Sequence, residues 1–170
     1  VMAKLGEHEV EYYYNWKKVF EFLSADFMIG DKDIRTFSQI DGRTGKAVMN
    51  RYGAYSMCFN NPDYRQVYFD YLKDVVKTGI DGIMNDDVAF MPAGDSYDSC
   101  TCEHCRKLFF EETGYEIPQP EEWSEFIENY DNPAYIAWKK FKHKSTQRFY
   151  RDLTEFYDSI GAKLLRPNYH

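Results

Sequence analysis

The stretch NPDYRQVYFDYLKDVVKTGIDGIMNDD, residues 61–87, contains the pattern on which the predicted fold rests. Its first residues favour a helix start, because Asn61 can act as an N-cap, Pro62 suits the first helical position and Asp63 favours the positive end of the helix dipole. Gly79 predicts the end of this helix. The apolar stripe expected to be buried consists of Tyr64, Val67, Tyr68, Tyr71, Leu72 and Val75.

A short buried strand is predicted directly after that glycine, over residues 80–84. The acidic pair Asp86-Asp87 follows it. A helix, a glycine, a strand and a polar cluster in this order form an αβ unit that ends at the carboxyl edge of a strand. Alternating units of this kind are typical of a parallel sheet.

The rest of the chain extends the same alternation. Helices are predicted over residues 9–27, 103–113 and 121–129 and from Asn132 to about residue 160, and strands over 34–40 and from 163 onward. We therefore expect an α/β fold of the (β/α)8 TIM-barrel type. A complete barrel needs about 250 residues, so the expectation is a single partial barrel domain over residues 1–170, with a Cys-rich zinc loop at about 98–106.

Composition narrows the range of functions. The chain has 170 residues, a net charge of −7 and 18% aromatic residues. The acidic balance argues against nucleic acid as a partner, since a phosphate backbone requires a basic face. No apolar run is long enough to span a membrane and no signal peptide is visible, which favours a cytoplasmic location. The sequence contains neither a phosphate-binding glycine loop nor a serine nucleophile elbow.

The four cysteines are the most specific motif. Cys100, Cys102 and Cys105 form a C-x-C-x-x-C run, and Cys58 lies upstream. Three thiolates this close can bind one metal ion, and a distant fourth completes a tetrahedral site, which predicts a structural zinc ion without an open position for chemistry. Two disulfides or four unpaired thiols are the alternatives, and His104 could replace one cysteine ligand.

Candidate catalytic residues lie at the end of the predicted strand over residues 80–84. Successive strand residues point to opposite faces, so one of Asp86 and Asp87 is expected to face a cleft. A carboxyl group there can protonate a leaving oxygen or hold a sugar hydroxyl, whereas the alternative is an aspartate that caps the next loop. Candidate substrate-binding residues are polar and lie at or near the ends of predicted strands: Asn85, Asp41, Asn168 and His170. Gln39, near the end of the predicted strand over residues 34–40, is a similar candidate.

Three features of the sequence, taken together, resemble those of a known protein family. The run Cys58-Phe59-Asn60-Asn61-Pro62, the stretch over residues 82–87 and the C-x-C-x-x-C run are similar to the catalytic barrel of glycoside hydrolase family 42, a family of β-galactosidases, and to related barrels. The resemblance implies a zinc cluster of one upstream cysteine and the three later ones. It also implies a general acid/base at Asp86 or Asp87, where the family has Asn-Glu, and a second carboxylate on a later strand.

The resulting functional expectation is a glycoside hydrolase that acts on the glycosidic bonds of a carbohydrate, represented here by a fragment without the second carboxylate. Two alternatives stay open. One is a carbohydrate-binding barrel without hydrolytic activity, and the other is a zinc-stabilised protein-interaction module. A partial barrel leaves strand edges unpaired, so a homo-oligomer or association with the rest of a longer chain is expected.

Overall fold

Helices dominate the part of the chain that the computed structural model describes, which is residues 28–29, 32–49, 55–78, 90 and 98–161. Two short strands, β1 (Met28–Ile29) and β2 (Lys32–Asp33), pair antiparallel and lead into the 3-10 helix η2 (Ile34–Phe37). The remaining elements are α2 (Pro62–Lys77), α3 (Glu103–Thr113), the 3-10 helix η3 (Pro120–Glu122), α4 (Trp123–Phe126) and α5 (Pro133–Ser159).

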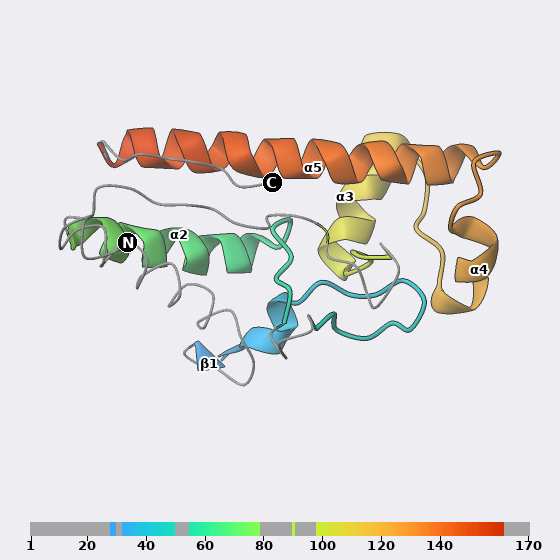
Figure 1. Cartoon of the computed structure of the whole chain (residues 1–170), viewed down its shortest axis with the longest axis horizontal. Coiled ribbons are helices and arrows are strands. Elements are labelled where there is room, and N and C mark those ends of the chain that lie inside the picture. Colours follow the sequence, from blue (N-terminus) through green and yellow to red (C-terminus); the bar gives the residue numbers. More distant parts are fainter. Residues whose placement is uncertain (1–27, 30–31, 50–54, 79–89, 91–97, 162–170) are drawn as a thin grey trace, which may run out of the picture.

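The long helix α5 is the element against which the other helices pack (Figure 1). Its 27 residues give it a length of roughly 40 Å. α4 lies near its N-terminal end, α3 near its middle and α2 along its C-terminal half. Aromatic pairs mark these contacts, among them Trp123–Trp138, Phe109–Phe141 and Phe69–Phe156, with ring centroids 5.4, 5.4 and 4.7 Å apart.

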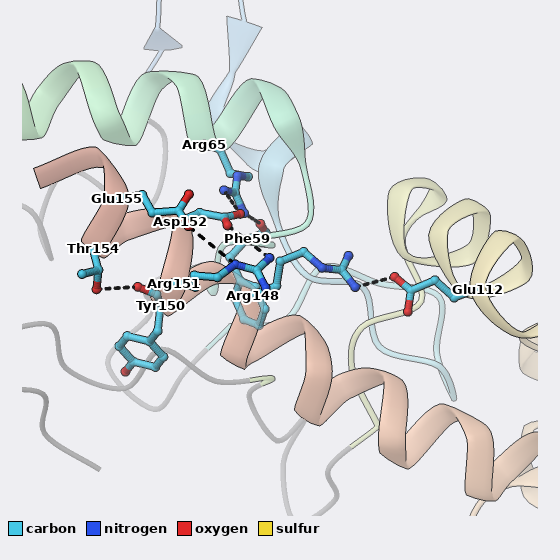
Figure 2. A network of polar contacts seen from close by, with 9 residues as sticks. All are labelled: Phe59, Arg65, Glu112, Arg148, Tyr150, Arg151, Asp152, Thr154 and Glu155. Atoms are coloured by element: carbon cyan, nitrogen blue, oxygen red, sulfur yellow. Dashed lines mark hydrogen bonds and ion pairs between the residues drawn. The ribbon is translucent and has the colours of Figure 1, made fainter. Parts of the chain in front are cut away.

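Helices α2 and α5 run side by side in the same direction. The guanidinium of Arg65 donates to the carboxylate of Asp152 over 2.6 Å (Figure 2). One turn further along both helices, Phe69 stacks on Phe156. The Arg65 guanidinium also lies 5.3 Å from the ring centroid of Phe149. An ion pair, a cation–π contact and aromatic stacking therefore all stabilise the contact between α2 and α5.

Helix α3 meets α5 through one apolar and one charged contact. Phe109 is fully buried and meets Phe141 edge to face. At the surface, Arg148 of α5 pairs with Glu112 of α3 (Figure 2). The buried aromatic pair supplies most of the stabilisation, because a half-exposed ion pair is worth little.

The predicted boundaries of the main helices are confirmed. The Asn61 side chain accepts hydrogen bonds from the backbone amides of Asp63 and Tyr64, over 2.9 and 3.2 Å, as an N-cap should. Asn132 caps α5 in the same way. Gly114 ends α3 in the left-handed conformation, at φ 72°.

The predicted parallel α/β barrel is wrong. The described residues are mostly helical, and their only strands are the two-residue antiparallel pair and isolated antiparallel bridges. The physical reason is what the apolar stripes pack against: in a barrel the stripes of α2 and α5 would cover a sheet, whereas here they pack on each other. The predicted helix over 9–27 and the predicted strands over 80–84 and from 163 onward lie outside the described residues.

The predicted strand over residues 34–40 is also wrong. Its first half is the 3-10 helix η2, and its second half makes single antiparallel bridges, Ser38 with Met57 and Ile40 with Ala47. The buried side chain of Gln39 donates to the carbonyl of Met57 over 3.1 Å, so polar contacts replace a continuous ladder here. The turn predicted at 41–45 is present.

A membrane-spanning helix must be both long and apolar. Within the described ranges, no helix combines the length and the apolar character needed to cross a bilayer. α5 has sufficient length, but its sequence contains charged residues throughout its second and third turns and beyond.

Candidate metal centre

All four cysteines meet at one point in the structure. Their sulfurs lie within 4.8 Å of one another, although Cys58 is far from the other three in sequence. The Sγ atom of Cys58 is 3.5 Å from that of Cys105 and 3.5 Å from that of Cys102. Cys58, Cys100 and Cys105 are fully buried and Cys102 is partly exposed, and none of the four forms a disulfide.

The segment over residues 37–41, which begins at the last residue of η2, holds the two cysteine-bearing loops together. The carbonyl of Phe37 accepts a hydrogen bond from the amide of Cys58 over 2.8 Å, and the carbonyl of Ile40 accepts one from the amide of Thr101 over 2.9 Å. Asp41 forms an antiparallel bridge with Ser99. One extended segment therefore places Cys58 on one side and the loop 98–102 on the other.

Helix α3 supplies the fourth sulfur. Cys102 is its N-cap residue and Cys105 lies in its first turn. The predicted zinc loop at about 98–106 is thus a loop over 98–102 followed by the start of α3. His104 lies in the same turn but does not belong to the cluster of metal-binding atoms.

Within the described part of the chain, N–H groups donate to the sulfurs of Cys100 and Cys105. The backbone amides of Ile40 and Cys102 donate to the Sγ atom of Cys100 over 3.3 and 3.5 Å. The side-chain amide of Asn60 donates to the Sγ atom of Cys105 over 3.4 Å. Donors of this kind stabilise negative charge on sulfur, and groups outside the ligand set commonly orient metal ligands. The N-cap of α2 is Asn61 and not its neighbour Asn60.

The four clustered thiols shift one another's pKa values. Hydrogen bonding with Cys100, Cys105 and Cys58 lowers the pKa of the Cys102 thiol. Hydrogen bonding to Cys100 and Cys102, followed by burial, raises the pKa of Cys58, and the same causes raise the pKa of Cys105. A cation that binds the four sulfurs displaces these protons, so its affinity falls as the pH is lowered.

The sulfur separations fit a four-coordinate metal ion. A tetrahedral thiolate site with metal–sulfur bonds of about 2.3 Å has sulfur–sulfur edges of roughly 3.8 Å. The two closest pairs lie at 3.5 Å and every pair lies within 4.8 Å. The four cysteines can therefore hold one metal ion after small shifts of their side chains.

Two further charged groups lie beside the cluster and had no recognisable motif in the sequence. Asp98 is 1% exposed; its Oδ2 atom accepts hydrogen bonds from Arg43, and its Oδ1 atom has no hydrogen-bond partner within the described part of the chain. Burial lowers the pKa of Lys142 to about 8, and nearby Asp98 opposes this shift. The ammonium of Lys142 lies 3.8 Å from the ring centroid of Trp138.

Most of the predicted catalytic and substrate-binding residues cannot be placed. Asp86, Asp87, Asn85, Asn168 and His170 lie outside the described residues. Of the polar candidates at predicted strand ends, the structure describes Gln39, whose hydrogen bond to Met57 is given above, and Asp41. Asp41 is buried, and its carboxylate accepts a hydrogen bond from the amide of Thr44 over 2.6 Å, which closes the turn over 41–45.

Comparison with known proteins assigns the chain to no family. No protein-family model, no curated protein and no solved structure matches the chain. The resemblance to glycoside hydrolase family 42 stays a prediction from sequence. The cysteine cluster is therefore the feature from which a function can be argued.

Proposed function

We propose that this chain is a zinc-stabilised helical module, in which Cys58, Cys100, Cys102 and Cys105 together bind one structural Zn²⁺ ion. The observation that carries the proposal is the convergence of four free, mostly buried cysteine sulfurs within 4.8 Å. Four thiolates favour zinc over the hard cations magnesium and calcium, which prefer oxygen ligands. A site with four protein ligands leaves no position for a reacting water, so its role is to hold the fold.

The ion would join parts of the chain that have little regular structure of their own. Cys58 follows a stretch of isolated bridges, and Cys100 and Cys102 lie in a loop. Ordering such segments costs about 1–2 kcal/mol of backbone entropy per residue. Backbone hydrogen bonds, such as those that link Phe37 to Cys58 and Ile40 to Thr101, offset part of that cost, and metal–thiolate bonds would add to them. Through Cys105 the same ion fixes α3, and therefore α5, relative to these loops.

The glycosidase activity expected from the sequence stays a prediction, because its candidate acids Asp86 and Asp87 lie outside the described residues. The interaction module, the third function considered from the sequence, is the one that the described residues favour. A tetrathiolate zinc site and a helical, aromatic-rich core are sufficient for such a module. Neither feature requires a catalytic cleft.

Native mass spectrometry of the purified chain, with and without a strong chelator, tests the proposal. We expect one zinc ion per chain, removed by the chelator together with the near-ultraviolet circular dichroism of the buried aromatic residues. Magnesium offered to the stripped protein serves as a control and should neither bind nor restore the signal. A metal-free chain whose mass is short by the hydrogens of two disulfides would contradict the proposal.

A further inference from the structure

We propose that Asn60 couples the metal centre to helix α5, so that metal binding and the docking of α5 strengthen each other. The inference rests on the proposed zinc site and assigns a positioning role to a residue that is not a ligand. Asn60 lies between Cys58 and the start of α2, and its side chain reaches both the cysteine cluster and α5.

The side-chain amide of Asn60 contacts both partners at once. Its Nδ2 atom lies 3.4 Å from the Sγ atom of Cys105 and 3.1 Å from the Oγ atom of Ser145. A primary amide has two N–H bonds, so one can point to the sulfur and the other to the hydroxyl. The same nitrogen thereby links a metal ligand on α3 to the middle of α5.

Ser145 is an unusual residue for its position. It is 1% exposed and occupies the buried stripe of α5 between Phe141 and Phe149. The other buried residues of this helix are all large: Tyr135, Trp138, Phe141, Phe149, Leu153 and Tyr157. A small hydroxyl side chain at this point leaves room for Asn60 and gives its amide a partner, since a buried polar group without one is costly.

Metal binding strengthens this contact for an electrostatic reason. A protonated thiol is a weak acceptor, whereas a metal-bound thiolate carries negative charge and accepts a charge-assisted hydrogen bond. Loading the site therefore holds the Asn60 amide more firmly, and this amide in turn holds Ser145. Coupling between two sites is reciprocal, so weakening the contact to α5 must also weaken metal binding.

The test measures zinc affinity and amide hydrogen exchange in wild type and in variants of the two residues. Asn60→Ala removes both hydrogen bonds, and Asn60→Asp keeps the shape but replaces the donor with a negative charge beside the thiolates. We expect either change to weaken zinc binding by about 10–100-fold, the range typical of groups that orient metal ligands. Asn129→Ala, at an exposed asparagine, is the matched control and should leave zinc affinity unchanged.

Hydrogen exchange separates coupling from a merely structural role. In wild type, zinc should slow amide exchange over residues 141–149 of α5. In Asn60→Ala this zinc-dependent protection should be clearly weaker than in wild type, even at zinc concentrations that saturate the site, because only the packing of α3 on α5 still transmits it. Ser145→Ala leaves the sulfur contact in place, so it should show the same weakened protection while binding zinc more tightly than Asn60→Ala does. Ser159→Ala, at an exposed serine of the same helix, should behave as wild type.

Two results would overturn the inference, and they are distinguishable. If wild type binds zinc and Asn60→Ala keeps both the affinity and the zinc-dependent protection of α5, the coupling role is wrong while the proposed function stands. If wild type binds no zinc, the proposed function fails and the inference fails with it. Should Asn60→Ala not fold, the comparison of Ser145→Ala with Ser159→Ala decides the question.

Discussion

Replacing Cys58 with serine is expected to weaken metal binding at least a thousandfold and to lower the thermal midpoint of the chain by roughly 8–16 °C. A thousandfold loss of affinity removes about 4 kcal/mol of ligand-linked stabilisation, and a domain of this size loses about 2–4 °C per kcal/mol. Cys58 should be the most sensitive ligand, because it is the one member of the four-cysteine cluster that comes from the segment before α2. Calorimetry at fixed free zinc measures the change.

Met57→Leu is the matched control for this substitution. Met57 precedes Cys58 and is also buried, but it offers no metal ligand to the cluster and its replacement conserves volume. Such a swap should cost less than about 1.5 kcal/mol and leave the metal content unchanged. A Cys58→Ser chain that retains one tightly bound metal ion and a wild-type midpoint would show that Cys58 is not a ligand.

Truncating Phe109 is expected to destabilise the chain by about 3–5 kcal/mol, the usual cost of removing a buried aromatic side chain. Phe109 is fully buried in α3 and meets Phe141 of α5 edge to face, with ring centroids 5.4 Å apart. The alanine leaves a cavity where α3 packs on α5, close to the ligand Cys105. Urea unfolding followed by circular dichroism gives the free energy of unfolding.

The next residue offers a control that differs mainly in burial. Phe110 lies in the same helix but is 52% exposed. Phe110→Ala involves the same atoms and the same change in helix propensity, so its effect should lie within about 0.5 kcal/mol of zero. Equal losses of stability in the two variants would contradict the packing of α3 described above.

Local signals in the sequence predicted the helices well. The Asn-Pro pairs at 61–62 and 132–133 mark the starts of α2 and α5, and Gly114 marks the end of α3, because capping depends on residues adjacent in the chain. The predicted helix over 103–113 has the bounds that the structure shows. The helix expected over 121–129 is shorter, since it consists of η3 and α4.

The fold class could not be derived in the same way. The stripe of α2 shows which face is buried, but it does not show whether a sheet or another helix covers that face. The partner is set by contacts such as Phe69 with Phe156, between residues far apart in the chain. The alternation in residues 34–40 was similarly ambiguous, because a few bridged residues and a strand share the same pattern.

The cysteine cluster was predictable and its surroundings were not. A C-x-C-x-x-C run with one distant cysteine has few structural explanations, so the sequence alone predicts all four members of the cluster. The contacts of Asn60 with Cys105 and Ser145 span 45 and 85 residues. No local pattern reports such contacts, and an asparagine beside a helix start is normally assigned to capping.

Titration of the metal-free, reduced chain with Co²⁺ tests the central claim most directly. Cobalt replaces zinc in such sites, and its visible and near-ultraviolet absorption reports the number of thiolate ligands and the coordination geometry. The account predicts saturation at one equivalent with the intense spectrum of a tetrahedral, four-thiolate complex, which excess zinc then abolishes. A weak octahedral spectrum, or no saturation at one equivalent, would contradict it.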